Sequence, residues 1–351
     1  MQNYFRLFLF PFAILYGIAV WLRNKLYDFG ISKQYKAPIK TICVGNLSTG
    51  GTGKTPHTQY IAKYIDSLNI VPAILSRGYG RKSKGFLEVT KQSTATQVGD
   101  EPLQIKYSLP TNAKNFVCEN RAVGIKKIME SNSNIECIIL DDAYQHRAVK
   151  CGLNILLTEA SKLFTDDFLL PVGNLRESKT EIKRANLVVV TNTKPHHNKT
   201  EIQQKVSNYF MGEIVFSSIK YLQKLFHWNN QNVIIINDVI NYEILVYTGI
   251  ANASNFLEHI SSFKKPEHVF TFTDHHILTK TEVQKIVDTF TSITKNKIII
   301  TTEKDVMRMK NNSDFSVFNS LPLFYLPIEI TFDKNDEIKF KKIVENYVRS
   351  N

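Results

Sequence analysis

The sequence has few cysteines, and none is placed to hold a metal ion with another. No two of the four, which are Cys43, Cys118, Cys137 and Cys151, form a CxxC pair. We therefore expect neither a disulfide framework nor a cysteine zinc site, and a reducing compartment suits the chain. Internal repeats and low-complexity tracts are also missing. With 43% hydrophobic and 22% charged residues, the composition excludes a disordered chain.

Long apolar runs are scarce, and only residues 7–22 (LFLFPFAILYGIAVWL) raise the question of a membrane. As a helix these sixteen residues span about 24 Å, which is short of the roughly 30 Å hydrocarbon core. No small-residue cleavage site follows, which argues against a signal peptide. Basic residues outnumber acids over residues 23–40. This pattern predicts an N-terminal membrane-associated helix at an anionic leaflet, with a helix buried against the next domain as the alternative.

Acidic residues are fewer than basic ones: the 351 residues include 44 Lys and Arg but 32 Asp and Glu, which gives a net charge of +12. Such a surplus indicates an anionic partner, which is a nucleic acid, a phosphorylated ligand or an acidic membrane. No base-stacking or groove-reading motif accompanies the charge, so we expect no nucleic-acid partner. The length predicts roughly two domains, each with its own core.

Short unbroken apolar runs alternate with segments of helical spacing from residue 41 onward. Runs of this kind are typical of strands buried on both faces, and the alternation predicts a parallel α/β sheet. The first series comprises residues 41–46, 71–76, 116–119, 135–140, 153–158 and 187–191. A second series comprises residues 232–236, 244–250, 268–272, 297–302 and 323–330. The extended segments at 213–231 are candidates for a link between two domains.

A glycine-rich segment follows the first predicted strand and precedes a helical pattern. Gly53, Lys54 and Thr55 match the end of the P-loop pattern, although Ser48 replaces its first glycine. The backbone would face phosphate oxygens, with Lys54 on the β/γ-phosphates and the Thr55 hydroxyl on Mg²⁺. ATP is favoured over GTP because no acidic residue follows Asn192-Thr193-Lys194 to read guanine. The expected nucleotide contacts are Gly50, Gly51, Thr52, Gly53, Lys54 and Thr55.

Acidic residues end the fourth predicted strand, at Asp141-Asp142. Such carboxylates are typical of a Walker B magnesium site, and a turn or helix cap is the alternative. The Asp100 carboxylate, between Gly99 and Pro102, suits a base that accepts a hydroxyl proton, although the tetrapeptide alone reads as a helix start. Asp274-His275-His276 is expected on a strand-to-helix loop, where ligands of α/β proteins bind; a zinc site there lacks a third ligand.

The ordered motifs resemble the tetraacyldisaccharide 4′-kinase family of lipid A biosynthesis. The motifs that carry the resemblance are VGNLSTGGTGKTP (44–56), LSRGYGR (75–81), GDEP (99–102), LDDAYQHR (140–147), NLRE (174–177), TDHH (273–276) and TTEKD (301–305). The resemblance implies transfer of the γ-phosphate of ATP, with Mg²⁺, to the 4′-hydroxyl of a lipid A disaccharide precursor. The implied location is the cytoplasmic face of the bacterial inner membrane, and no obligate protein partner is implied.

The resemblance also implies an architecture of two Rossmann-like P-loop-type α/β domains joined by a β linker, with the active site in the cleft. The expected units are a membrane-associated segment at 1–40, a nucleotide-binding domain at 41–212, a linker at 213–231 and a smaller domain at 232–351.

Individual residues take roles from the resemblance. Asp100 becomes the catalytic base and His275 its partner across the cleft, while Lys54 binds phosphate. Thr55, Asp141, Asp142 and Glu177 form the implied metal site. Candidate substrate contacts are Arg77, Arg81, Asn174 and Arg147. Lys82 and Lys84 extend the same basic loop, for which a solvated surface loop is the alternative.

One departure from the family concerns the acidic motif, which usually reads DDGFQHR. Ala143 and Tyr144 stand here in place of glycine and phenylalanine. Since Ala143 cannot adopt a glycine-only backbone angle cheaply, we expect a slightly different turn.

Two other classes of protein share parts of this pattern. One alternative function is a P-loop kinase or ligase for a soluble metabolite, which would not need the apolar N-terminus. The other is a membrane-attached P-loop ATPase switch, in which the Asp274-His275 motif of a second domain is not expected.

Overall fold

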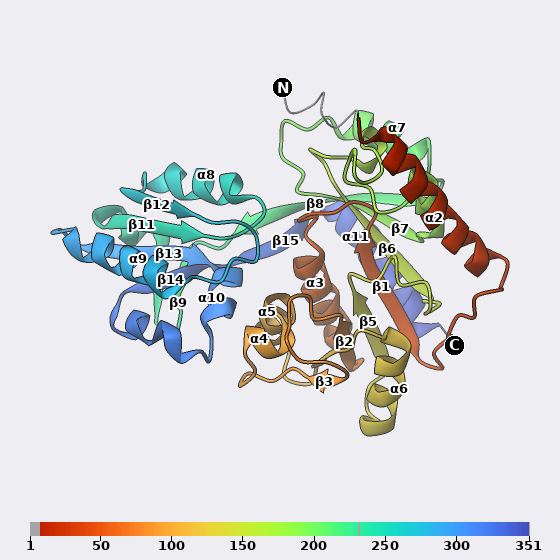
Figure 1. Cartoon of the computed structure of the whole chain (residues 1–351), viewed down its shortest axis with the longest axis horizontal. Helices are drawn as coiled ribbons and strands as arrows, with labels where there is room; N and C mark the ends of the chain where they lie inside the picture. The colour runs from red at the N-terminus through yellow and green to blue at the C-terminus, as the bar shows by residue number, and fades with distance from the viewer. Residues whose placement is uncertain (1–7, 231, 351) are drawn as a thin grey trace.

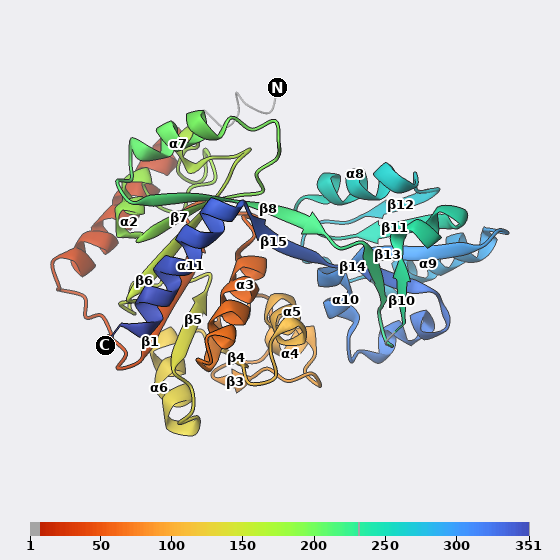
Figure 2. The ribbon, with the colours of Figure 1, turned by 180° about the vertical axis from the view of Figure 1, so that it is seen from behind.

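The computed structural model describes residues 8–230 and 232–350. Residues 1–7 lie outside the described residues, and they include Leu7, the first residue of the predicted apolar run. Residue 231 of the predicted linker and the terminal residue 351 also lie outside them. Two sheets organise the described chain, one of nine strands and one of six (Figures 1 and 2). The predicted α/β class with parallel sheets is therefore confirmed.

The larger sheet has the strand order β15-β8-β7-β6-β1-β5-β2-β4-β3. Its strands from β8 to β4 run parallel, and β15 and β3 add antiparallel edges. The central strands are buried at nearly every residue, as the unbroken apolar runs predicted. The bounds are β1 Lys40–Asn46, β2 Pro72–Ser76, β3 Leu87–Glu88, β4 Lys114–Val117, β5 Cys137–Asp141, β6 Leu153–Glu159, β7 Leu187–Thr191, β8 Glu213–Tyr221 and β15 Ile328–Phe332.

Helices cover both faces of this sheet. On one face the apolar side chains of α6 and α7 join the core, and on the other those of α3, α5 and α11 do. The bounds are α2 Phe10–Asp28, α3 Lys54–Ser67, α4 Ala95–Val98, α5 Asp100–Ser108, α6 Arg121–Ser131, α7 Lys199–Ser207 and α11 Lys334–Arg349, with short 3₁₀ helices η1 Phe164–Asp166 and η2 Lys179–Arg184.

The smaller sheet has the order β10-β9-β14-β13-β11-β12, in which β14, β13, β11 and β12 are parallel. Its bounds are β9 Lys224–His227, β10 Val233–Ile235, β11 Glu243–Thr248, β12 His268–Thr271, β13 Lys297–Thr302 and β14 Leu323–Leu326. The helices around it are α8 Ala253–Phe263, α9 Lys280–Ser292, α10 Glu303–Met309, η3 Ile236–Asn241 and η4 Ser313–Ser320.

Two strands, rather than one segment, connect the sheets. The first half of β8 pairs with β7, and its second half pairs antiparallel with β15, so both cross between the halves of the molecule (Figure 2). Pro327, which has no N–H for a ladder, separates β14 from β15, so the predicted strand 323–330 belongs to two sheets. The chain then returns, and α11 packs on the larger sheet. Residues 328–350 thus lie with the first sheet, not with the rest of the predicted unit 232–351.

The two halves also share a core. Val98 and Leu103, in α4 and α5 of the first half, belong to one buried cluster with Val306 and Met307 of α10. This cluster brings α5 and α10 together, and both helices carry site residues described below.

The N-terminal helix α2 lies along the outside of the larger half (Figure 1). Ala13 and Asn24 are the buried residues of α2, and Arg23 and Asp28 pair with Glu177 and Arg147, so one side of the helix packs on the domain behind it, as the alternative expected. Membrane association of the other side stays a prediction. The apolar side chains of α2 that are more than half exposed are Phe12, Ile14, Leu15, Ile18, Trp21 and Leu22. Within the described residues, no helix combines the length and apolarity that a membrane span requires.

Candidate active site

The phosphate loop begins where β1 ends, and α3 begins at its last residues. Gly50 and Gly53 have φ angles of 108° and 81°, which L side chains rarely adopt, so glycine is required there. The Asn46 side chain donates to the Thr52 hydroxyl at 2.9 Å and fixes the loop from beneath. Lys54 Nζ lies 3.4 Å from the Gly50 carbonyl oxygen, so the lysine folds over the loop. The backbone N–H groups of the glycine-rich loop and of the α3 N-terminus are thus available to bind an anion.

The aspartates at the end of β5 lie beside this loop because β1 and β5 are adjacent, with Val44 opposite Asp141. Asp141 is buried and accepts hydrogen bonds from Thr58 at 2.9 Å and Ser76 at 3.3 Å. Burial and the neighbouring Glu101 and Asp142 carboxylates raise the pKa of Asp141 to about 6. A carboxyl that is costly to ionise here would be stabilised as an anion by a nearby cation.

Asp142 lies closer to the phosphate loop and is partly exposed. Its carboxylate is 3.8 Å from Lys54 Nζ and 3.2 Å from the Arg176 guanidinium. The left-handed backbone angle of this turn falls on Asp142, whose φ is 44°. Ala143, which follows, has no positive φ and packs in the core, so the turn does not require a glycine at position 143.

The predicted base, Asp100, is the first residue of α5. Gly99 precedes it with a φ of 95°, and a Cβ at that position would meet the Tyr79 carbonyl oxygen at 3.0 Å. Asp100 is 7% exposed, and its Oδ1 accepts from the Glu101 N–H at 2.9 Å. The GDEP tetrapeptide is therefore a helix start, as its local pattern indicates, and it also faces the second half of the chain.

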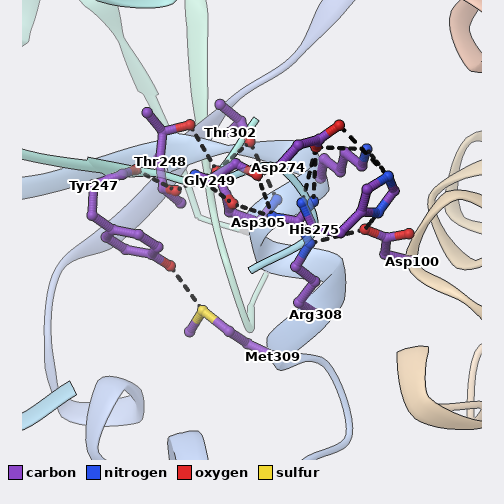
Figure 3. Close-up of polar contacts among 12 residues, drawn as sticks. Asp100, Tyr247, Thr248, Gly249, Asp274, His275, Thr302, Asp305, Arg308 and Met309 are labelled. Atoms are coloured by element: carbon purple, nitrogen blue, oxygen red, sulfur yellow. Dashed lines mark hydrogen bonds and ion pairs between the residues drawn. The ribbon is translucent and has the colours of Figure 1, made fainter. Parts of the chain in front are cut away.

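His275 approaches Asp100 from the loop between β12 and α9 (Figure 3). Its Nδ1 lies 3.0 Å from Asp100 Oδ2. Since an ionised carboxylate only accepts, Nδ1 is the donor to Asp100, and Nε2 lies 3.4 Å from Lys304 Nζ and 3.6 Å from Asp274 Oδ2. The φ of His275 is 60°, an uncommon conformation held by the surrounding contacts. The structure thus brings together the two residues that the resemblance paired.

Two cations on α10 belong to the same cluster and carried no role in the sequence-based prediction. Lys304 binds Glu101 at 3.1 Å and Asp274 at 3.2 Å, and Arg308 Nε donates to Asp100 Oδ2 at 2.9 Å. Burial acts to raise the pKa of Asp100, but the His275 hydrogen bond and the charges of Lys304 and Arg308 outweigh it and hold the pKa well below its usual range. The sequence feature that could have pointed to these cations is TTEKD (301–305), one of the family motifs, because α10 begins within it.

Glu177, the fourth residue of the predicted metal site, has a fully buried side chain between two arginines. Arg23 binds one carboxylate oxygen at 2.7 Å, and Arg184 binds the other. Within the described residues, no group of three or more His, Cys, Asp or Glu side chains is placed to hold a metal ion. A metal role for Glu177 stays a prediction.

The candidate substrate contacts are spread over several loops. Arg77 is exposed, whereas Arg81 is already paired with Glu119 at 2.7 Å. Arg147 binds Asp28 of α2 at 2.8 Å, so it holds that helix against the sheet.

Asn174, the remaining candidate substrate contact, donates to Asp167 at 3.0 Å. The substrate roles of Arg77, Arg81, Arg147 and Asn174 stay predictions.

Comparisons with known proteins cover nearly the whole chain. The model of the family described as tetraacyldisaccharide-1-P 4′-kinase matches residues 5–349. A tetraacyldisaccharide 4′-kinase of Flavobacterium psychrophilum is 41% identical, covering 99% of this chain and 98% of the relative. One of Bacteroides thetaiotaomicron is 38% identical over 98% and 93% of the two chains. A crystal structure of LpxK from Aquifex aeolicus in complex with ATP has a TM-score of 0.76 and 29% identity, covering 98% and 99%.

Proposed function

Because the chain belongs to the tetraacyldisaccharide 4′-kinase family, we propose that it transfers the γ-phosphate of ATP to the 4′-hydroxyl of a tetraacyldisaccharide 1-phosphate in lipid A biosynthesis. The observation that carries the proposal is the cluster of Asp100, His275 and Arg308, which joins the two halves of the molecule. Glu101, the residue after Asp100, is close enough to Asp141 beside the phosphate loop to raise the pKa of that carboxyl. The two sheets then correspond to two Rossmann-like domains, with the P-loop in the first, joined by the β8/β15 ribbon.

Asp100 acts in this proposal on the acceptor hydroxyl. Its Oδ2 receives the donors of the second half, while Oδ1 accepts from the Glu101 N–H. Oδ1 therefore has the remaining acceptor capacity for the sugar hydroxyl. It takes the hydroxyl proton as the sugar oxygen bonds to the γ-phosphorus and the bond from that phosphorus to ADP breaks. Phosphoryl transfer depends mostly on positioning and electrostatic stabilisation, so a weakly basic but fixed carboxylate suits this role.

Lys54 and the loop N–H groups bind the phosphates and offset their charge. The residues present also fit a magnesium ion carried by the nucleotide: Thr55 offers a hydroxyl, and Asp141 and Asp142 offer carboxylates at the end of the adjacent strand. Mg²⁺ usually takes one or two protein carboxylates together with phosphate oxygens and waters, so three acidic ligands are not needed. When bound, Mg²⁺ would neutralise negative charge on the phosphates.

We also propose that the enzyme works on the cytoplasmic face of the inner membrane. The support is α2, whose apolar side chains face outward while Arg23, Lys25 and the following lysines lie nearby in the chain. An amphiphilic acceptor resides in that membrane, so binding there brings enzyme and substrate together.

Product analysis tests this proposal. Purified protein, Mg²⁺ and ATP labelled at the γ-phosphate are incubated with or without the lipid disaccharide 1-phosphate in mixed micelles. We expect label in the lipid product, with little phosphate release when the acceptor is omitted. Phosphate release without lipid labelling would instead identify an ATPase switch. Labelling of a soluble metabolite in a parallel reaction that contains a small-molecule cell extract, without labelling of the lipid, would identify the metabolite kinase.

A further inference from the structure

The TTEKD segment anchors a hydrogen-bond network at the edge of the smaller sheet. Asp305 accepts from the Thr302 hydroxyl at 2.6 Å, the Thr248 hydroxyl at 3.0 Å and the Gly249 N–H at 3.0 Å. These donors come from the carboxyl ends of the neighbouring strands β11 and β13. Asp305 is 5% exposed, and so it is a fixed anion at the start of α10.

Arg308 links this fixed anion to Asp100 (Figure 3). Its Nη1 donates to Asp305 Oδ1 at 2.8 Å and to the Gly249 carbonyl oxygen at 2.7 Å. Its Nε donates to Asp100 Oδ2 at 2.9 Å, across 208 residues of sequence. The Arg308 side chain is at least as buried as the two carboxylates it joins. The position of Asp100 is thus tied to the second sheet independently of His275.

We propose that Arg308 is a positioning residue for phosphoryl transfer: it clamps Asp100 Oδ2, with His275, and leaves Oδ1 for the acceptor hydroxyl. This role rests on the proposed kinase function. In this proposal, Asp305 holds the Arg308 guanidinium in place. Arginine suits the task because its planar fork reaches Asp100 and Asp305 from different nitrogens at once, which a lysine ammonium on a flexible stem does less well.

The charges around Asp100 determine how losing Arg308 would act. The facing groups from all packed elements are His275, Lys304, Arg308, Glu101, Asp274 and Asp305. Burial alone favours the neutral acid, and the cations keep the carboxylate ionised. Removing Arg308 leaves the His275 hydrogen bond and the Lys304 charge to oppose burial and the acids Glu101, Asp274 and Asp305, so the pKa of Asp100 rises. A merely structural arginine would not move the acidic limb of the rate profile.

The experiment combines kinase kinetics with a double-mutant cycle. Arg308→Gln and Arg308→Lys are made in the wild-type and Asp100→Asn backgrounds, and kcat, the KM for ATP and the pH dependence are measured. Lys310→Gln is the matched control, because it removes one cation at the end of the same helix, where Lys310 lies over Tyr107 and Trp228. Thermal melting checks that each variant folds.

We expect Arg308→Gln to lower kcat roughly ten- to hundredfold, the range for a lost charge-assisted hydrogen bond, with the KM for ATP unchanged. The acidic limb of the pH dependence of kcat should move to higher pH in Arg308→Gln. Arg308→Lys should recover part of kcat, and Lys310→Gln should resemble the wild type. In the Asp100→Asn background, loss of Arg308 has no further effect.

Equal losses in both backgrounds, or an unmoved acidic limb, would overturn this role. If Arg308→Gln does not fold, Arg308→Lys replaces it in the double-mutant cycle. We then expect a smaller loss of kcat, and only in the background that retains Asp100. The proposed function is judged separately: a wild type that labels the lipid supports it whatever the Arg308 variants do, and an inactive wild type refutes both.

Discussion

Arg23 of α2 binds Glu177 at 2.7 Å, and the Glu177 side chain has no exposed surface. Arg184 binds the other oxygen, so one buried carboxylate holds a cation from the N-terminal helix and a cation from η2. Asn24 adds a hydrogen bond to the same carboxylate at 3.3 Å. The N-terminal helix is therefore attached to the sheet by polar contacts along one side, and its apolar side chains remain outward.

Replacing Glu177 should destabilise the fold. Glu177→Gln takes the anion from Arg23 and one of two carboxylate partners from the partly buried Arg184, which keeps Glu181 at 3.0 Å, so we expect a cost of about 2 kcal/mol, as for a lost hydrogen bond to a charged group. Glu258→Gln is the control, since Glu258 is 74% exposed in its pair with Lys194 and should change stability by less than about 1 kcal/mol. Denaturant unfolding of the apoprotein measures both. Unchanged stability together with lost Mg²⁺ binding would assign Glu177 to the metal site instead.

The exposed face of α2 should bind membranes. Leu15 and Trp21 are 64% and 56% exposed, so a Leu15→Glu, Trp21→Glu double variant should fold with nearly unchanged stability. Its binding to vesicles containing phosphatidylglycerol should fall at least about tenfold, because apolar burial is replaced by charge. Ile338→Glu, at an equally exposed apolar position on α11, should leave flotation unchanged. Equal binding by all three proteins would refute a membrane role for α2.

Asp141 should make the apoprotein less stable as the pH rises. Its pKa is about 6 in the folded protein against 3.8 ordinarily, so the folded state binds more protons between these values. The penalty grows from about pH 4 to pH 6 and is complete above it, and Asp141→Asn should remove up to about 3 kcal/mol of it.

Unfolding of the Asp141→Asn, Asp142→Asn and wild-type proteins at pH 4 and pH 8 checks this expectation. Only Asp141→Asn should gain stability at pH 8, since Asp142 is paired with Lys54 and Arg176. Binding of magnesium nucleotide should weaken below about pH 6 as the carboxyl takes up a proton. A loss of stability in Asp141→Asn at pH 8 would contradict the account.

His275 should affect turnover rather than ATP binding. His275→Ala removes one of the two donors to Asp100 Oδ2, so kcat should fall roughly tenfold or more with an unchanged KM for ATP. His276→Ala is the neighbouring control, because His276 binds Glu282 at 2.8 Å and stacks on Phe272 instead. A wild-type kcat in His275→Ala would exclude the pairing from catalysis.

Much of the fold follows from local patterns. The predicted strand 41–46 is Lys40–Asn46, and the strand-to-helix loop predicted for Asp274-His275-His276 lies between β12 and α9. The sheet to which each strand belongs could not be predicted in the same way, because an apolar run does not indicate which strand lies next to it. The run 323–330 divides at Pro327, and α11 returns to the larger sheet through contacts with residues far away in sequence.

The site shows the same division between local and distant causes. The P-loop is contiguous, so Lys54 and Thr55 can be identified by spacing and by the strand before them. Arg308 has only the weak signal of lying one helical turn after Asp305. Its contact with Asp100 exists because α10 packs against α5 in a shared core, which no local pattern encodes.

Single-turnover transfer by the wild type and Asp100→Asn tests the central claim most directly. Each enzyme, in excess over ATP labelled at the γ-phosphate, is mixed with the lipid disaccharide 1-phosphate, and label at the 4′-position is followed with time. We predict that the wild type labels that position and that Asp100→Asn does so about a hundredfold or more slowly, since positioned proton acceptors contribute 10²–10⁴-fold. Equal rates in the two proteins, or no label in the lipid with the wild type, would contradict the account.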